Sequence, residues 1–233
     1  MAQDAQGQLV DPFGGQQDLQ AGWLRHVSAA FAEDPVRILR VARFAARYAG
    51  RGFQVAAETL QLMQEMVIAG EVDALVAERV WAEMVKALAE PDPGQFFVVL
   101  QQVGALPRIL PELAPALAGA LSESRLLALL AMLAQQTTEP LLRFAALAQV
   151  LDKTGLMALC RRLRIPNDYQ QLTVLVLSFY PHYAQGLTYS AEQRLLQLEQ
   201  ADAFRRPQRF QQGLQVCQSI DFIPEHLALT AGW

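Results

Sequence analysis

Apolar residues recur at steps of three and four along most of the chain, which is the period of amphipathic helices. The segment 58–68 follows this period until Gly70 ends it. The same pattern predicts further helices at 35–48, 77–88, 96–103, 122–135, 141–152, 156–163, 165–178, 190–200 and 207–219. A turn is expected at 180–183, around Pro181. Few segments alternate as strands do, so the pattern predicts an all-α protein.

The helix expected at 35–48 carries a one-sided set of arginines. Asp34 has the chemistry of an N-cap, and Pro35 suits the first helical position, where its missing N–H costs nothing. At 100° per residue, an arc of about 120° holds Arg37, Arg40, Arg43 and Arg47. The neighbouring apolar arc, which we expect to pack, holds Ile38, Val41, Phe44, Ala45 and Tyr48.

A carboxylate at 34 and a guanidinium at 37 together suit the edge of a base or a phosphate. The alternative is an ordinary helix cap followed by a solvated arginine face. The residue types and their spacing leave both interpretations open.

Composition narrows the class of protein. With 52% hydrophobic residues over 233 positions, the chain can bury one substantial core or two smaller ones. No unbroken apolar run reaches about 18 residues and the first thirty residues contain no secretory signal, so we expect a cytoplasmic protein with no membrane partner. Cys160 and Cys217 are isolated, which indicates buried, reduced thiols rather than a disulfide framework or a zinc site.

Basic residues are concentrated locally, although the formal net charge is −4. One cluster of arginines lies between Arg25 and Arg51, where Glu33 and Asp34 are the only acids. Further clusters contain Arg161, Arg162 and Arg164, then Arg205, Arg206 and Arg209. Such clusters suit contact with a few phosphates along one side of an RNA, with salt-dependent affinity. The alternative for the later clusters is a solvated helix surface.

Four segments carry a resemblance to one family, and they follow one another along the chain in the family's order. Glu33-Asp34-Pro35-Val36-Arg37 resembles the EDxxR motif of bacterial CCA-adding tRNA nucleotidyltransferases and the related poly(A) polymerases. The segment 11–19 is similar to the family's hinge, 78–83 (ERVWAE) to the next neck motif, and 96–113 to the start of its body. In addition, 23–27 is similar to the extended segment that precedes the neck helices.

The resemblance implies roles for individual residues. Asp34 and Arg37 would hydrogen-bond to the base of an incoming ATP or CTP, with Arg40 supporting them. The arginines expected to contact tRNA are Arg43, Arg47, Arg161 and Arg162.

The resemblance also implies an all-α arrangement of the neck and body domains of a class II enzyme, after a short non-helical N-terminal segment. The expected divisions are 1–23 as a remnant of head and hinge, 24–90 as the nucleotide-recognition neck, 91–170 as the body and 171–233 as a partial tail. The boundary at 90–91 rests on the helix breaker Pro91-Asp92-Pro93-Gly94.

Met1-Ala2 resemble the end of a segment in the family's catalytic head, so we expect that head to be missing or separately encoded. Its metal-binding carboxylates would be missing with it. We therefore expect no catalytic residue, no metal site and no cofactor in this chain. Magnesium and ATP or CTP are implied only for the full-length enzyme.

A further segment, 143–153, resembles the RFAxLxHDLGK motif of family members that also contain a metal-dependent phosphohydrolase of the HD type. Gln149 and Val150 stand at its His-Asp positions. Glutamine and valine cannot replace imidazole and carboxylate as metal ligands, so hydrolase chemistry is not expected.

Taken together, these features predict part of a tRNA nucleotidyltransferase that selects ATP or CTP and binds tRNA but is inactive alone. The alternative, from a different class, is a stand-alone helical RNA-binding or assembly module derived from this family. The sequence does not distinguish CCA addition from A-addition alone or poly(A) synthesis.

Overall fold

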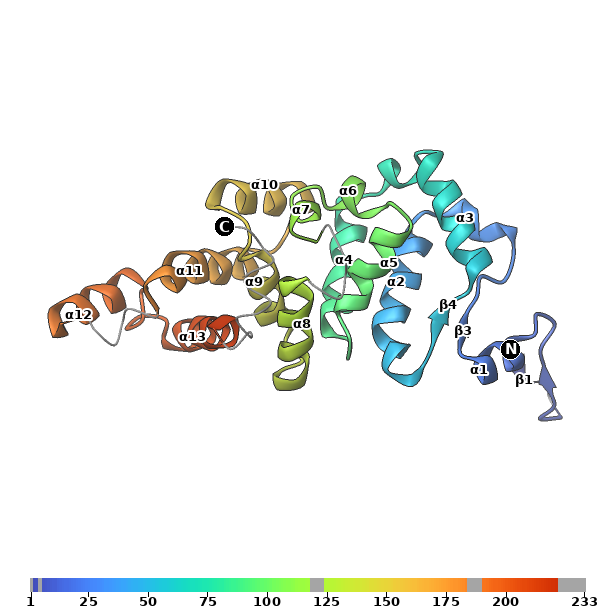
Figure 1. Cartoon of the computed structure of the whole chain (residues 1–233), viewed down its shortest axis with the longest axis horizontal. Coiled ribbons are helices and arrows are strands. Elements are labelled where there is room, and N and C mark those ends of the chain that lie inside the picture. Colours follow the sequence, from blue (N-terminus) through green and yellow to red (C-terminus); the bar gives the residue numbers. More distant parts are fainter. Residues whose placement is uncertain (1, 4–5, 118–123, 184–189, 222–233) are drawn as a thin grey trace. The chain divides into compact units, whose positions relative to one another are not determined.

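A computed structural model describes residues 2–3, 6–117, 124–183 and 190–221 (Figure 1). Most of this described part is helical, which confirms the expected all-α class. The chain divides into two compact units, Met1–Ile109 and Leu110–Trp233. None of the described helices is both long enough and apolar enough to cross a bilayer.

The first unit holds six α-helices among its described residues, together with short 3₁₀ turns and two pairs of two-residue strands. The helices are α1 (Gly15–Ala21), α2 (Val36–Tyr48), α3 (Ala57–Ile68), α4 (Ala77–Ala89), α5 (Gly94–Gln102) and α6 (Leu106–Ile109). The 3₁₀ turns are η1 (Ala29–Glu33), η2 (Ala49–Arg51) and η3 (Glu71–Ala74). Strands β1 (Ala2–Gln3) and β2 (Leu9–Val10) pair antiparallel, and β3 (Trp23–Leu24) pairs parallel with β4 (Gln54–Val55).

Helix α2 lies at the centre of this unit, packed against α4 and α5 (Figure 1). Its buried residues are Val36, Ile38, Leu39, Ala42, Ala45 and Ala46. The predicted packing arc was therefore partly wrong, because Val41, Phe44 and Tyr48 remain partly exposed. Helices α4 and α5 cover the face that carries Leu39 and Ala42, and this leaves the adjacent apolar face accessible.

The start of α2 agrees with the expected cap. One carboxylate oxygen of Asp34, Oδ1, accepts the backbone N–H of Val36 at 3.1 Å. The carbonyl of Asp34 accepts the N–H of Arg37 at 3.0 Å, so the first turn closes around Pro35. The regular helix begins at Val36, one residue after the expected start.

The N-terminal segment is not free of helix, contrary to the prediction. Helix α1 forms there although it buries no residue, and its start is fixed by the carboxylate of Asp11. That carboxylate accepts the backbone N–H groups of Gly15 at 2.9 Å and Gln16 at 2.8 Å. Hydrogen bonds from these two groups keep the pKa of Asp11 below its usual value. A capping side chain therefore makes a helix where the sequence reads as a turn.

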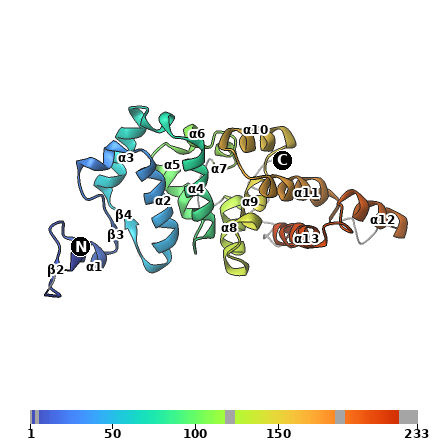
Figure 2. The ribbon, with the colours of Figure 1, turned by 180° about the vertical axis from the view of Figure 1, so that it is seen from behind.

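In the second unit, α9 (Pro140–Ala148) packs against three other helices (Figure 2). These are α8 (Arg125–Gln136), α11 (Asn167–Tyr183) and α13 (Pro207–Asp221). The unit also contains α7 (Ala114–Leu117), α10 (Lys153–Leu163) and α12 (Ala191–Gln200). Every residue of α9 from Leu142 to Ala148 is buried, as expected for a central helix.

Two expected boundaries in the second unit were wrong. The backbone of α11 stays helical through Pro181 to Tyr183, where a turn was predicted. Because Pro181 lies in the last turn, it removes only one helical hydrogen bond near an end that frays anyway. The helix expected to reach 152 ends at Ala148 instead, and Asp152 caps α10 by accepting the N–H of Gly155 at 2.6 Å.

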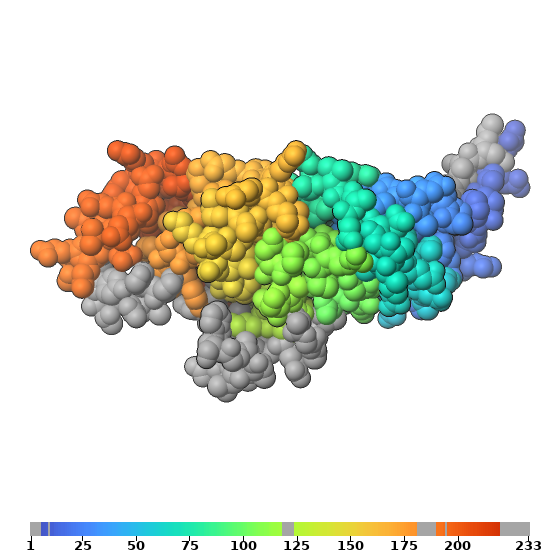
Figure 3. Space-filling model, turned by 90° about the horizontal axis from the view of Figure 1, so that it is seen from above, coloured from blue at the N-terminus to red at the C-terminus, as the bar shows by residue number. Residues whose placement is uncertain are grey.

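Helix α12 begins with a capping box between Ser190 and Gln193. It leaves apolar side chains exposed, with Leu195 51% and Leu196 54% accessible, and Phe204 after it is 66% accessible. Figure 3 shows this segment, in orange, at the surface of its unit.

The division between the units falls after Ile109. The predicted boundary at 90–91 lies inside the first unit, because α5 follows it and packs on α2. The assignment of neck, body and tail to residue ranges stays a prediction.

Candidate functional site

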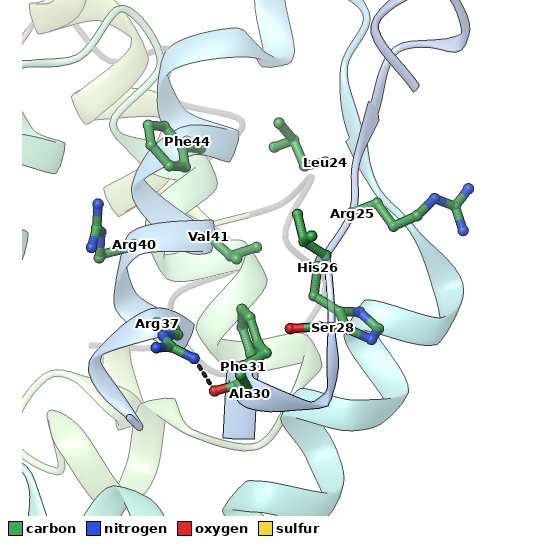
Figure 4. Close-up of a pocket in the computed structure, with 11 residues that line it drawn as sticks. Leu24, Arg25, His26, Ser28, Ala30, Phe31, Arg37, Arg40, Val41 and Phe44 are labelled. Atoms are coloured by element: carbon green, nitrogen blue, oxygen red, sulfur yellow. Dashed lines mark hydrogen bonds between the residues drawn. The ribbon is translucent and has the colours of Figure 1, made fainter. Parts of the chain in front are cut away.

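A concave pocket of about 430 Å³ lies beside α2 in the first unit (Figure 4). We call it the α2 pocket. One wall is α2, through Arg37, Arg40, Val41 and Phe44. The other wall is the segment of β3 and the residues that follow it, through Leu24, Arg25, His26, Val27, Ser28, Ala30 and Phe31. Two residues of the apolar face that was expected to pack, Val41 and Phe44, therefore line this pocket instead.

The two predicted nucleotide-binding arginines that line the pocket have different surroundings. A terminal nitrogen of Arg37 (Nη1) donates to the carbonyl oxygen of Ala30, which ties α2 to η1 (Figure 4). Arg40 is exposed, and it has neither a hydrogen-bond nor an ion-pair partner within the described part of the chain. Arg40 is therefore available to an anionic ligand.

The wall opposite α2 is held by Thr59, a buried residue of α3. The hydroxyl of Thr59 accepts the backbone N–H of His26 at 3.0 Å and lies 2.8 Å from Nδ1 of the same residue. The ring of His26 lies 5.7 Å from that of Phe31, centroid to centroid. Arg25 points away from α2 in Figure 4 and pairs with Asp18 at 2.9 Å. The rim opposite α2 is thus fixed from α3.

Asp34, the third residue predicted to bind the nucleotide, does not line the α2 pocket. Its Oδ2 accepts a hydrogen bond from Nη2 of Arg79, in α4, at 2.7 Å. The hydrogen bond from Arg79 and the one from the N–H of Val36 outweigh partial burial and keep the pKa of Asp34 below its usual value. The carboxylate is therefore ionised at neutral pH and already has two donors.

Arg43, predicted to contact RNA, is held inside the unit. Its Nε lies 2.7 Å from Oε2 of Glu83, its Nη1 lies 3.5 Å from Oε1 of Glu90, and only 13% of its side chain is exposed. Its guanidinium carbon also lies 4.6 Å from the ring centroid of Phe44. Arg47 is 52% exposed and lies 4.0 Å from Glu90. The arginine arc therefore includes both a solvent-exposed residue, Arg47, and one that packs inside the unit, Arg43.

Glu83 is the acidic centre of this arrangement. Burial alone would raise its pKa, but hydrogen bonds from Arg43 and from Lys86, at 3.2 Å, outweigh burial and bring the pKa below the usual value. Glu83 is consequently a charged, nearly buried link between α2 and α4.

The other predicted RNA contacts, Arg161 and Arg162, belong to the second unit, in the last turn of α10. Arg162 binds both carboxylate oxygens of Glu112, at 2.8 and 2.6 Å. Arg161 is exposed and has no partner among the described residues. Of the two, Arg161 is the side chain available to a ligand.

The first part of the segment similar to the HD motif, residues 143–148, is buried in α9 and has a structural role. The guanidinium of Arg143 is fully buried and donates to the carbonyl oxygens of Thr137, at 2.9 Å, and Ala134, at 3.1 Å. These carbonyls end α8, so Arg143 caps that helix with a positive charge. Gln149 follows the end of α9. In the described ranges, no three His, Cys, Asp or Glu residues come together as a metal site would need.

Sequence reasoning quoted Arg79 and Glu83 within the ERVWAE motif but gave them no role, and it missed Lys86. The signal was present, because positions 79, 83 and 86 are spaced by four and three and so share one face of α4. The sequence does not show that this face of α4 meets α2.

Comparison with known proteins places this chain in a family. Residues 52–117 match a family described as "Probable RNA and SrmB- binding site of polymerase A". The chain is 45% identical over 248 residues to the Multifunctional CCA protein of Thioalkalivibrio sulfidiphilus, an alignment that covers 94% of this chain and 60% of that protein. It is 43% identical to the CCA-adding enzyme of Pseudomonas putida strain W619, with 94% and 58% covered.

A solved structure, "Crystal structure of tRNA nucleotidyltransferase complexed with a primer tRNA and an incoming ATP analog", has a similar fold. The TM-score is 0.66 at 20% identity, and the match covers 96% of this chain and 67% of that one. The chain belongs to the family of CCA-adding tRNA nucleotidyltransferases and related poly(A) polymerases. It spans about 60% of the length of the curated relatives it matches.

Proposed function

We propose that this chain contributes nucleotide selection and tRNA binding to CCA addition, and that it does not perform the chemical step. The observation that carries the proposal is the α2 pocket, where Arg37 and Arg40 lie beside the apolar and aromatic side chains of Phe31, Val41 and Phe44. Such a combination suits a nucleotide, since a base has an apolar face and its phosphates are anionic.

Asp34 would join Arg37 in reading the edge of ATP or CTP. Its carboxylate is held at the helix start by Val36 and Arg79. The pair with Arg79 is largely exposed, and exposed ion pairs contribute only about 0–1 kcal/mol. Exchanging this partner for a base edge would therefore cost little.

The family supports these partners. Titles of structural neighbours describe complexes of tRNA nucleotidyltransferase with "a primer tRNA and an incoming ATP analog" and of CCA-adding enzyme with ATP. In this chain, the exposed arginines among those predicted to bind nucleotide or tRNA are Arg40, Arg47, Arg161 and Arg162.

The test is titration of the chain with ATP and CTP, comparing wild type with Arg37→Ala and Asp34→Asn. We expect either substitution to weaken binding by roughly tenfold, the equivalent of about 1.4 kcal/mol, because a charge-assisted hydrogen bond is lost. In thermal melts, the free energy of unfolding should change little for Asp34→Asn. For Arg37→Ala it should change by about 1 kcal/mol or less.

Arg51→Ala is the matched control, since Arg51 is an exposed arginine in the turn after α2 and lies outside the pocket. Equal weakening by Arg51→Ala would mean that general charge, not a site, attracts the nucleotide. Binding of tRNA without any nucleotide binding would instead favour the stand-alone RNA-binding module.

A further inference from the structure

A second concavity, of about 310 Å³, lies on the other side of Arg40, between α2 and α4. We call it the α2–α4 groove. Four of the residues that line it are cationic, namely Arg40, Arg43, Arg79 and Lys86. Glu83 is the one carboxylate in its lining, and Val36 and Ala82 complete it.

The groove keeps a positive charge after its internal pairs are counted. Glu83 is bound by Arg43 and Lys86, and Asp34 and Glu90 bind Arg79 and Arg43 from outside the lining. These three carboxylates face four cations. Arg40 is the cation that has no partner in the described ranges.

The cations that face solvent retain donors for a ligand. Arg79 is 53% exposed and its ion pair with Asp34 uses Nη2, although a guanidinium has five N–H donors. Lys86 is 58% exposed, and its ammonium has three donors. The more buried Arg43, held by Glu83 and Glu90, forms a fixed positive floor.

The lining distinguishes this groove from the α2 pocket. It contains no aromatic residue, so it lacks the aromatic surface that the α2 pocket offers to a base. Its four cations favour phosphate groups. Its α4 residues also lie within 52–117, the range that matches the family description of a probable RNA-binding site.

We propose that the α2–α4 groove binds backbone phosphates of an RNA strand, beside the nucleotide in the α2 pocket. This inference rests on the proposed function for its choice of RNA over other polyanions. Arg79 and Lys86 contact the phosphates from α4, and Arg40 contacts them from α2.

The test measures binding of a tRNA transcript that lacks its 3′-terminal CCA, at several salt concentrations, to the full chain. Lys86→Gln is compared with Lys153→Gln, which neutralises the chain's other lysine, in the second unit. We expect Lys86→Gln to weaken binding several-fold and to reduce the slope of log affinity against log salt by about one, as for the loss of one phosphate contact. Lys153→Gln should leave both unchanged.

Ala82 offers a second, independent pair of variants. Ala82→Glu places a carboxylate in the groove, whereas Ala82→Gln adds nearly the same volume without charge, and both residues suit a helix. We expect at least tenfold weaker RNA binding for Ala82→Glu than for Ala82→Gln. Far-ultraviolet circular dichroism of both variants shows whether the helix is kept.

Titration with ATP and CTP separates the two sources of phosphate. The proposal requires Lys86→Gln and Ala82→Glu to leave these affinities within twofold of wild type. If they weaken as much as RNA binding does, the groove holds the triphosphate of the nucleotide and the RNA assignment is wrong.

The proposal is also overturned if the wild type shows no salt-dependent RNA binding, or if Lys86→Gln and Lys153→Gln behave alike. Failure of Arg37→Ala to weaken nucleotide binding would overturn the α2 pocket assignment but not the groove. The two proposals therefore fail separately.

Discussion

At the scale of single residues, the nearly buried ion pair of Arg43 and Glu83 shows that one arginine of α2 is used for packing, although the same helix also presents arginines to ligands. Both side chains are 13% exposed or less. In such surroundings the loss of one partner leaves the other charge uncompensated, which costs more than the pair contributes as a whole.

We expect Glu83→Gln to lower the free energy of unfolding by about 2–3 kcal/mol, because Arg43 loses its shortest ion pair. The measurement is urea unfolding at pH 7. Glu65→Gln serves as control, since Glu65 is an exposed glutamate on α3, and its change should stay within about 0.5 kcal/mol. Equal, small changes for both variants would show that Glu83 does not hold α2 to α4.

The effect of Glu83→Gln on the free energy of unfolding should depend on pH, and the lowered pKa of Glu83 fixes the direction of this dependence. A carboxyl whose pKa is lower in the folded state stabilises the fold above its unfolded pKa and loses that contribution as the pH falls through the folded value. The ordinary pKa of Glu83 is 4.5, and its folded value lies below that. The stability difference between wild type and Glu83→Gln should therefore be constant at neutral pH and shrink below about pH 4.5.

How far the site could be predicted differs from residue to residue. Arg37 and Arg40 are three apart, so helical geometry alone places them on one face and the structure puts both in the α2 pocket. The partners of Arg43 and Asp34 could not be foreseen, because Glu83 and Arg79 lie 40 and 45 positions away along the chain. Tertiary pairing at that separation leaves no local signal.

At the scale of elements, the parallel pairing of β3 with β4 sets where the wall opposite α2 runs. Gly22, with φ of +73°, precedes β3, and its carbonyl accepts the N–H of Gln54 at 2.8 Å. A Cβ added at Gly22 would meet the carbonyl oxygen of Gly52 at 3.0 Å. Both the backbone conformation and the close approach therefore require glycine here.

We expect Gly22→Ala to destabilise the first unit by about 2 kcal/mol, since the left-handed conformation costs about 1–2 kcal/mol and the contact adds to it. Gly50→Ala is the matched control, because nothing lies within 4 Å of an added Cβ and its φ is not in the left-handed range. That variant should be neutral or slightly stabilising. Thermal melts of both variants test this prediction. Similar melting temperatures for the two would contradict the requirement for glycine at Gly22.

Helices with a long apolar periodicity were predicted well. Elements whose formation depends on a few specific contacts were predicted poorly. Helices α3, α4, α12 and α13 fall close to their expected ranges, because each carries several turns of pattern. Helix α1 is short and buries nothing, so no period announces it, and its start depends on the capping carboxylate of Asp11. Strands β1, β2 and β4 were missed because two residues cannot show alternation, whereas β3 lies in the segment 23–27, for which the family resemblance implied an extended conformation.

At the scale of the whole chain, the central expectation is that the chain alone does not catalyse nucleotidyl transfer. Nucleotidyl transfer needs carboxylates that hold divalent metal ions against both reacting oxygens. We expect the 233-residue chain, given magnesium, labelled ATP or CTP and tRNA lacking its 3′ end, to incorporate no nucleotide. The CCA-adding enzyme of Pseudomonas putida, a relative at 43% identity, is the positive control. Incorporation that copurifies with the chain would show that it carries a catalytic centre of its own.

The division into units belongs to this scale as well, and it was the hardest feature to foresee. A Pro-Gly breaker at 91–94 is a strong local signal, yet the units separate after Ile109. The reason is that α5 buries Phe96, Phe97 and Leu100 within the first unit. Local breakers end helices, whereas the extent of a shared core decides where a unit ends.

Arg40 belongs to the lining of both the α2 pocket and the α2–α4 groove. A single guanidinium that serves two concavities links their binding equilibria. A phosphate that draws Arg40 into the groove removes it from the nucleotide, so each ligand lowers the affinity for the other. By thermodynamic necessity the two reductions are the same factor. One unpaired side chain would thus make this helix face an antagonistic switch, in which filling one cavity promotes release from its neighbour.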